Sequence, residues 1–320
     1  MSKIRCAVIG VGYLGRFHAQ KYKLLSNVEL VAVCDLDQKT VATVSDELQV
    51  PGYTNYHDLF DKVDAVSISA TTNKHYEIAK SFLGRGIHTL IEKPITETLS
   101  QAAELIQLAK INNAKLQVGH LERFNSARLA LDKYLDNPLF IDSQRLAPYN
   151  PRGADVNVIL DVMIHDIDLI LNMVNSPIIS ISAQGAPVLT NAIDIANARI
   201  TFANHCVANL TASRISFKTE RTTRIFQQNT YLSIDYQNKK FAVFKKGDGE
   251  LFPGIPDITH EQKEFANGDA LFEEIKAFIK CIEKDSIPLV TGEDGLQALE
   301  TAEKITSLIN ANLMERHARI

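Results

Sequence analysis

The clearest chemical pattern in the chain is a set of glycines near the N-terminus. Gly10, Gly12 and Gly15 follow the pattern G-x-G-x-x-G directly after an apolar run, and a helical stretch begins there. Here Gly10 permits a tight turn, Gly12 lets the backbone approach a pyrophosphate, and Gly15 allows the helix to pack closely on a strand. An ordinary strand–helix turn is the alternative. The context favours a dinucleotide-binding loop whose anion faces the helix N-terminus, with Tyr13 and Leu14 also contacting the cofactor.

An acidic residue follows at the spacing that this loop requires. Asp35 lies 20 residues past Gly15, at the end of the second apolar run. A carboxylate at this place accepts hydrogen bonds from the ribose hydroxyls of an adenosine, and it repels a 2′-phosphate. No arginine follows directly, since the next residues are Leu36, Asp37 and Gln38. The pattern therefore favours NAD over NADP.

Two further groups of residues could act on a substrate. Glu92-Lys93-Pro94 follows a strand, at the sheet edge where ligands of open α/β sheets collect. Asp161 and His165 lie four residues apart on an otherwise apolar helix, so they share a face and can hydrogen-bond. A self-satisfied structural pair is one interpretation of the second group, and a metal site is a weaker one because no other His or Cys cluster has ligand spacing. An acid–base pair fits best, since a histidine titrates near neutral pH.

The elements that position these residues divide the chain in two. Up to residue 121, short apolar strands alternate with helices, which predicts a doubly wound Rossmann sheet with parallel strands. From residue 122 to 320, two helices are followed by several strands in succession and then by two closing helices. This order predicts a second α/β domain on an open, mostly antiparallel sheet. We expect NAD binding in residues 1–121 and substrate binding and oligomerisation in residues 122–320.

Composition excludes several classes of protein. The chain has 320 residues, 45% of them hydrophobic and 22% charged, and a net charge of −4. It therefore lacks the run of basic residues that nucleic-acid binding requires, and no apolar stretch is typical of a membrane-spanning helix. The four cysteines lie far apart among apolar neighbours, which indicates buried thiols without a disulfide or metal site. With a first strand in place of a signal peptide, we expect a cytoplasmic protein.

Taken together, these motifs resemble the glucose–fructose oxidoreductase/inositol dehydrogenase (Gfo/Idh/MocA) family. The resemblance rests on GVGYLG at the N-terminus, EKP at 92–94 and D-x-x-x-H at 161–165, and it covers essentially the whole chain. It implies a Rossmann domain, followed by a domain whose open antiparallel sheet often mediates homo-oligomerisation. It also implies that Lys93, Asp161 and His165 are the catalytic set.

Two other segments resemble the family less closely. Thr71-Thr72-Asn73-Lys74-His75 is similar to the TPN-x-x-H loop near the nicotinamide, with Thr72 in the place of the usual proline. This implies cofactor contacts from Thr71, Asn73 and His75, together with Glu92 and Lys93. The segment from Val118 to Asn125 is similar to the family's VG-x-x-x-RF segment, which makes Arg123 a candidate substrate ligand.

A narrower resemblance concerns the substrate. The stretch Arg145 to Arg152, followed by the Asp161–His165 helix, resembles bacterial UDP-N-acetylglucosamine 3-dehydrogenases. Those enzymes oxidise the C3 hydroxyl so that a partner aminotransferase can install an amine, on the route to amide-linked lipid A. Arg145 and Arg152 could bind a diphosphate, and Tyr149 could stack on uracil. Alternatively, both arginines are solvated loop residues.

The hypothesis from sequence is an NAD-dependent dehydrogenase that oxidises a secondary hydroxyl of a sugar. The favoured substrate is a UDP-linked amino sugar, oxidised at C3 of UDP-N-acetylglucosamine. In this hypothesis His165 takes the hydroxyl proton, Lys93 stabilises the alkoxide and Asp161 orients His165, although Lys93 could itself be the proton acceptor. Two alternatives stay open: a dehydrogenase of a free sugar or polyol such as an inositol, and an NAD(P)-sensing regulator without catalysis. A regulator without catalysis does not need Lys93, Asp161 and His165 together, so the presence of all three argues against that alternative.

Overall fold

The chain forms two compact units. The computed structural model describes residues 3–150, 156–265 and 268–317. The first unit contains Met1–Leu121 and Ala270–Gln297, and the second contains Glu122–Asp269 and Ala298–Ile320. The sequence analysis assigned all residues after 121 to the second domain. The structure instead returns residues 270–297 to the first unit, because the apolar face of the helix there packs into the first unit's core.

The first unit is a doubly wound parallel sheet of six strands in the order β3-β2-β1-β4-β5-β6. The order changes direction between β1 and β4, so a ligand crevice is expected at the carboxyl ends of these two strands. The strands are β1 (Ile4–Ile9), β2 (Val28–Cys34), β3 (Gly52–Tyr53), β4 (Ala65–Ile68), β5 (His88–Glu92) and β6 (Leu116–Gly119). The helices and the 3₁₀ turn are α1 (Tyr13–Leu24), α2 (Gln38–Leu48), η1 (Tyr56–Leu59), α3 (Thr72–Leu83), α4 (Leu99–Ile111) and α7 (Ala270–Glu283).

Local sequence explains where several of these helices begin. Asp37 caps α2, since its side chain accepts hydrogen bonds from the backbone N–H groups of Lys39 and Thr40. Thr98 and Gln101 form a capping box at the start of α4. Helix α1 is different, because its N-cap is Gly12 and its first turn carries no acidic residue. The N-terminus of α1 therefore keeps its attraction for an external anion.

The second unit is built on one sheet of eight strands in the order β14-β13-β12-β11-β7-β10-β9-β8. Only β7 and β10 pair in parallel, so the expectation of a mostly antiparallel sheet is confirmed. The strands are β7 (Phe140–Leu146), β8 (Ile178–Ala186), β9 (Ile195–Phe202), β10 (Val207–Ser213), β11 (Glu220–Gln227), β12 (Thr230–Asp235), β13 (Lys240–Phe252) and β14 (Ile255–Glu264). The helical elements are η2 (Leu121–Phe124), α5 (Ser126–Leu131), the π-helical turn η3 (Ile159–Met163), α6 (Ile164–Val174) and α8 (Gly292–His317), which begins in the first unit.

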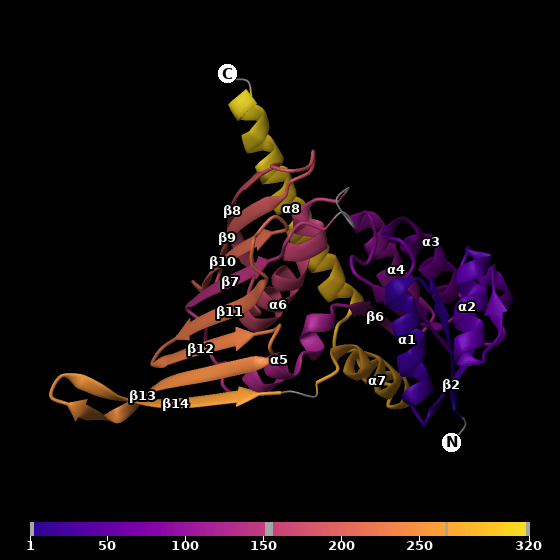
Figure 1. The fold of residues 1–320 in the computed structure, drawn as a ribbon, viewed down its shortest axis with the longest axis horizontal. Coiled ribbons are helices and arrows are strands. Elements are labelled where there is room, and N and C mark those ends of the chain that lie inside the picture. The colour runs from indigo at the N-terminus through magenta and orange to yellow at the C-terminus, as the bar shows by residue number, and fades with distance from the viewer. Residues whose placement is uncertain (1–2, 151–155, 266–267, 318–320) are drawn as a thin grey trace. The chain divides into compact units, whose positions relative to one another are not determined.

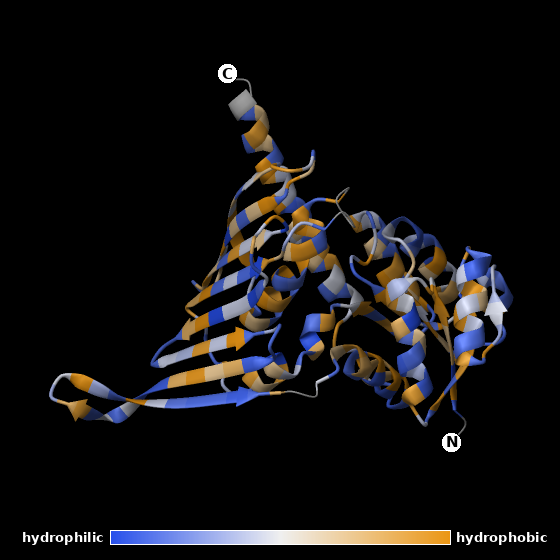
Figure 2. Cartoon of the chain, in the orientation of Figure 1, coloured by the Kyte–Doolittle hydropathy of each residue, from blue (hydrophilic) through white to orange (hydrophobic). Residues whose placement is uncertain are grey.

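Apolar and polar residues alternate along the strands of this second sheet (Figure 2). In β9, for example, Ala196, Ala198, Ile200 and Phe202 are buried, whereas the residues between them are more exposed. The buried face forms one core with residues of α5, α6 and α8, which lie along the same side of the sheet (Figure 1). Because successive side chains of a strand point to opposite faces, the sheet has one apolar face, which the helices cover, and one more polar face.

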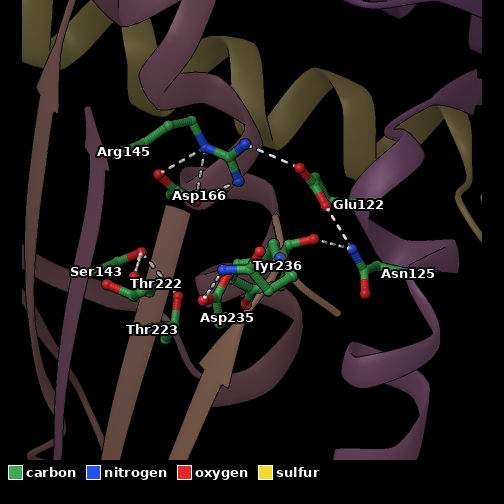
Figure 3. A network of polar contacts seen from close by, with 10 residues as sticks. Glu122, Asn125, Ser143, Arg145, Asp166, Thr222, Thr223, Asp235 and Tyr236 are labelled. Carbon is green, nitrogen blue, oxygen red and sulfur yellow. Dashed lines mark hydrogen bonds and ion pairs between the residues drawn. The ribbon is translucent and has the colours of Figure 1, made fainter. Parts of the chain in front are cut away.

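Two buried ion pairs hold α6 in place. On β7, the Arg145 guanidinium donates to both oxygens of Asp166, at 2.8–3.1 Å, and to Glu122 Oε1 at 2.9 Å (Figure 3). Arg123 makes a bidentate pair with Asp168, at 2.7 and 2.8 Å. Burial penalises the charge of Arg145, but Asp166 and Glu122 outweigh it and raise its pKa. Helix α6 is therefore joined to β7 and η2 by paired charges as well as by apolar contacts.

The structure differs from the predicted elements in three places. Strand β3 has two residues and gives no pattern in the sequence, and β14 was not predicted because its alternation is weak and mostly exposed. The predicted helix that carries Asp161 and His165 begins as the π turn η3 before α6. Cys6, Cys34, Cys206 and Cys281 are buried free thiols, as expected. Within the described part of the chain, no helix has the length and apolar character needed to cross a bilayer.

We expect Asp166→Ala to destabilise the second unit by about 3–5 kcal/mol, because it leaves the buried Arg145 charge with a single carboxylate. Urea unfolding measures this change. The matched control is Asp142→Ala, which removes the more exposed Arg224–Asp142 pair of the same sheet and should cost less than about 1 kcal/mol. Equal effects of the two substitutions would contradict the structural role of the Arg145 pair.

Candidate active site

The glycine loop lies between β1 and α1 and has the geometry that a dinucleotide needs. Gly10 has φ +81°, and a Cβ added to it would lie 2.5 Å from the Ala70 backbone nitrogen. A Cβ at Gly15 would lie 1.8 Å from the Gly10 carbonyl oxygen, so only glycine lets α1 start so close to the strand end. A Cβ at Gly12 would meet nothing within 4 Å. Space is therefore left in front of the loop at this position, where a phosphate group can approach the backbone.

A cavity opens beside this loop at the switch point of the sheet. Its volume is about 380 Å³. It combines the glycine loop with the carboxyl ends of β1, β2 and β4 and the start of α3, which is where nucleotides bind in doubly wound sheets. The lining residues are Ile9, Gly10, Gly12, Cys34, Asp35, Leu36, Thr54, Tyr56, Ser69, Ala70, Thr71, Lys74, Glu77 and Ile78.

Asp35 lines this cavity at the end of β2, and its carboxylate is oriented by the backbone. Oδ2 accepts the N–H of Val11 at 2.9 Å, and Oδ1 accepts the N–H of Asp37 at 3.0 Å. Each oxygen keeps further lone pairs for another donor. The carboxylate is therefore held in place before any ligand binds, and it can accept the ribose hydroxyls of an adenosine.

The N-cap and first turn of α3 contain both exposed and buried residues. Thr71 and Asn73 are exposed and hydrogen-bonded to each other at 2.7 Å, and Thr71 lines the cavity. His75 is 1% exposed, and its ring nitrogens lie 2.9 Å from the carbonyl oxygen of Pro94 and 3.0 Å from that of Ala70. Burial lowers the pKa of His75. The His75 ring thus links the segment before α3 to the segment after β5, and a cofactor contact from His75 stays a prediction.

The Glu92–Pro94 segment follows β5. Lys93 is half-buried and its peptide bond to Pro94 is cis. Glu92 is 9% exposed, and its Oε1 lies 3.1 Å from His18 Nε2 of α1. The sequence analysis expected a cofactor contact from Glu92. Its side chain instead points into the unit, because burial of a carboxylate demands a partner and His18 provides it.

In the second unit, Asp161 and His165 lie at the start of α6, and both are half-buried. Asp161 belongs to the π turn η3, whose first turn is fixed by Asn157: the Asn157 side chain accepts the N–H of Leu160 at 2.9 Å. Such π turns inside helices occur frequently at functional sites. His165 directly precedes Asp166, so the Arg145 ion pair also fixes the backbone that carries the histidine.

The expected arginine ligands are placed differently from the prediction. Arg123 and Arg145 are 5% and 4% exposed and are held in the ion pairs described above. Arg145 is therefore not a solvated loop residue, since its guanidinium is buried and held by Asp166 and Glu122. Tyr149 is 44% exposed and stays a candidate for base stacking. Arg152 lies outside the described residues.

The sequence analysis did not identify several residues of the site. Thr54 and Tyr56 reach the cavity from the segment after β3, a strand too short to predict. Leu36 could have been found, since it follows Asp35 directly. His18 could have been noticed as a histidine on the buried face of α1, but its partner is 74 residues away.

Family models match both parts of the chain. The model for the Gfo/Idh/MocA oxidoreductase family, described as an NAD-binding Rossmann fold, matches residues 4–120. The model for the Gfo/Idh/MocA C-terminal domain matches residues 119–232. Both matches agree with the division into two units near residue 121.

Curated relatives and solved structures extend over nearly the whole chain. The UDP-N-acetylglucosamine 3-dehydrogenase of Acidithiobacillus ferrooxidans is 37% identical, over 98% of this chain and 99% of the relative. A solved structure of that enzyme has a TM-score of 0.91 at 36% identity and covers 97% of this chain and 99% of its own. The myo-inositol 2-dehydrogenase of Thermotoga maritima is 25% identical, over 92% of this chain and 93% of the relative.

Gly12→Ala and Gly15→Ala form a matched pair that tests the glycine loop. Gly15→Ala should destabilise the protein by about 1–3 kcal/mol, because the new methyl group overlaps the Gly10 carbonyl. Gly12→Ala should keep the stability within about 1 kcal/mol, yet weaken NAD binding about tenfold or more by occupying the space for the phosphate. Thermal unfolding and calorimetric titration with NAD measure both effects. Unchanged NAD affinity in Gly12→Ala would rule out this loop as the phosphate site.

Proposed function

The chain belongs to the Gfo/Idh/MocA family of NAD-dependent oxidoreductases, and we propose that it oxidises the C3 hydroxyl of UDP-N-acetylglucosamine. The observation that carries this proposal is the 37% identity to an enzyme of that name over 98% of the chain. The more distant inositol dehydrogenases share less of the sequence, at about 25% identity. We therefore keep the hypothesis from sequence, an NAD-dependent dehydrogenase of a sugar or nucleotide sugar. Its proposed substrate is UDP-N-acetylglucosamine.

In the proposed mechanism the chain supplies acid–base groups, and NAD supplies the hydride acceptor. Gly10, Gly12 and the N-terminus of α1 would hold the pyrophosphate of the cofactor, and Asp35 would accept hydrogen bonds from its ribose. His165 accepts the hydroxyl proton while the hydride leaves the same carbon, so that the alcohol becomes a ketone. Lys93 holds the hydroxyl oxygen and stabilises the developing negative charge. Asp161 orients His165.

The buried positions of the two arginines change which residues are candidates for contact with the UDP group of the substrate. Arg145 and Arg123 support α6 and do not compete for the diphosphate. Tyr149 is the remaining described candidate from this segment for contact with the uracil ring. The ketone product retains its UDP group, and we propose that an aminotransferase consumes it, since a ketone is the substrate that transamination requires.

The substrate assignment predicts NADH formation from NAD with UDP-N-acetylglucosamine, but not with myo-inositol or glucose. A ketone-trapping reagent is included because oxidation of an alcohol by NAD is uphill. Activity with myo-inositol and none with the UDP-sugar would refute the substrate and keep the class of reaction. NAD binding without turnover of any of the three would instead indicate a regulator.

His165→Ala should lower kcat by about 10²–10⁴-fold, because it removes the proposed base. Lys93→Ala should lower it comparably, whereas Lys110→Ala, which changes an exposed lysine of α4, should leave it unchanged. NAD affinity, measured by titration, should stay within about twofold in His165→Ala. Turnover at the wild-type rate in either variant would remove that residue from the proposed mechanism.

We also propose that the second unit's sheet forms a homo-oligomer through the face opposite its helices. Five aromatic side chains form a continuous cross-strand row over neighbouring strands of this sheet, with ring centroids 4.4–5.7 Å apart. Phe226, the next-to-last residue of β11, is 39% exposed. A contiguous aromatic row of this kind is a common basis for association. The row consists of Phe140, Phe226, Tyr231, Phe244 and His260.

Phe226→Glu should convert the oligomer to smaller species, because it places a charge within the aromatic row, between Phe140 and Tyr231. Light scattering coupled to size exclusion measures the mass. Ile111→Glu is the control, since Ile111 is an exposed apolar residue of α4 in the other unit. A wild-type monomer, or an unchanged mass for Phe226→Glu, would refute this interface.

A further inference from the structure

Three buried titratable side chains meet inside the first unit, and the proposed mechanism does not use them. His18 comes from α1, Glu92 from the end of β5 and Glu274 from α7. His18 and Glu274 are fully buried, and Glu92 is 9% exposed. One nitrogen or oxygen atom of each lies within 4.8 Å of the others. Three such groups with so little water must share protons or hold a cation.

Glu92 is the centre of this cluster and is linked to Lys93. Its Oε1 lies 3.1 Å from His18 Nε2, and its Oε2 accepts the backbone N–H of Lys93 at 3.2 Å. Its side chain also has little freedom, because a Cβ at Gly119 of β6 would lie only 2.9 Å from Glu92 Oε1. The position of the Glu92 carboxylate therefore influences the backbone from which Lys93 extends.

Glu274 is the unusual member of the cluster. Neither of its carboxyl oxygens has a hydrogen-bond partner within the described residues. Burial raises its pKa well above the usual value, and the nearby negative charge of Glu92 adds to this shift. On Glu92, burial opposes ionisation, but His18 and Lys93 outweigh it and lower the pKa. Burial and the charge of Glu92 thus favour the protonated form of Glu274, whereas His18 and Lys93 favour the ionised form of Glu92.

A bound divalent cation is the competing explanation, since imidazole and two carboxylates are suitable ligands. The geometry favours protons. His18 Nε2 and Glu92 Oε1 already lie at hydrogen-bonding distance, and the other Glu92 oxygen accepts a backbone N–H. The side-chain partners of Glu92 are thus provided by the protein, and the neutral form of Glu274 removes the need for a second counter-charge.

We propose that Glu274 is a positioning residue for Lys93: its carboxyl group packs against Glu92 and keeps the Glu92 carboxylate directed at His18 and the Lys93 backbone. This rests on the proposed catalytic role of Lys93. The helix that returns to the first unit, α7, thereby contributes to the site through a single buried side chain. Apolar residues of α7, Ile275, Phe278 and Ile279, pack in the same core as Tyr22 of α1 and hold Glu274 at this depth.

The test compares a shape-conserving with a truncating substitution. Glu274→Gln mimics the neutral carboxyl and should keep kcat within about threefold. Glu274→Ala removes the support of Glu92 and should lower kcat about 10–100-fold, as misplacement of a catalytic group by about 1 Å does. NAD affinity should change less than about twofold in both. The controls are Glu273→Gln and Glu273→Ala, which change the neighbouring, half-exposed glutamate of α7 and should leave kcat unchanged.

A second measurement depends on the proton itself. A carboxyl whose pKa is raised by folding contributes stability that is present below its unfolded pKa, about 4.3, and is lost as the pH rises towards the folded pKa. The titratable groups that face Glu274 are His18 and Tyr22 of α1 and Glu92 of β5. Glu274→Gln keeps these groups and should therefore raise Tm relative to wild type by an amount that grows from pH 5 to pH 8.

Three results would overturn the proposal. The first is Glu274→Ala with wild-type kcat, which would show that Lys93 needs no such support. The second is Glu274→Gln as inactive as Glu274→Ala, together with about one equivalent of zinc or manganese in the wild-type protein by elemental analysis, which would establish a metal site. The third is a Tm difference that does not vary with pH, which would show that Glu274 is ionised. If Lys93→Ala is fully active, the proposed function of Lys93 fails, whereas the pH dependence of Tm still reports on Glu274.

Discussion

Asp166 and Arg145 form an ion pair inside the second unit, and the surrounding elements depend on it. Removing two charges from water costs several kcal/mol per ion, so the pair persists only while its geometry is preserved. Because Asp166 is on α6 and Arg145 is on β7, the helix cannot move along the sheet without exposing or unpairing a buried charge. Glu122 completes the coordination of Arg145 and is itself hydrogen-bonded to Asn125 (Figure 3). His165 is the residue next to Asp166, and its backbone position follows from this network.

The first unit also contains a buried carboxylate that needs a partner. Glu92 is buried at the end of β5, and its Oε1 lies at hydrogen-bonding distance from His18 Nε2 of α1. Lys93 follows Glu92 in the chain and lies between this pair and the His75 contact to the Pro94 carbonyl. In both units, then, the residue with a proposed chemical role directly adjoins a buried and paired carboxylate. Pairing of buried charge gives these positions a rigidity that loops alone rarely have.

Several features of the chain could be predicted from local sequence with good accuracy. The glycine loop, Asp35 and the alternation of strands and helices are patterns within about 35 residues. They specify the Rossmann unit because turn geometry and strand burial are set by neighbouring residues. The antiparallel sheet was predicted from several strands that follow one another directly in the sequence. Strand β3 and the distal part of β13–β14 lie outside the patterns, since they bury little apolar surface.

The roles of individual charged residues were decided by tertiary structure. Arg145 occupies an alternating segment, and nothing local distinguishes a guanidinium that faces solvent from one that meets Asp166, 21 residues further on. His18 and Glu92 are separated by 74 residues, and Glu274 reaches them only because residues 270–297 return to the first unit. The sequence by itself therefore determined the fold class, the dinucleotide loop and the chemically active residue types. Which charges are buried, and which partners neutralise them, was settled only by the fold, because the cost of burying a charge depends on segments that are distant along the chain.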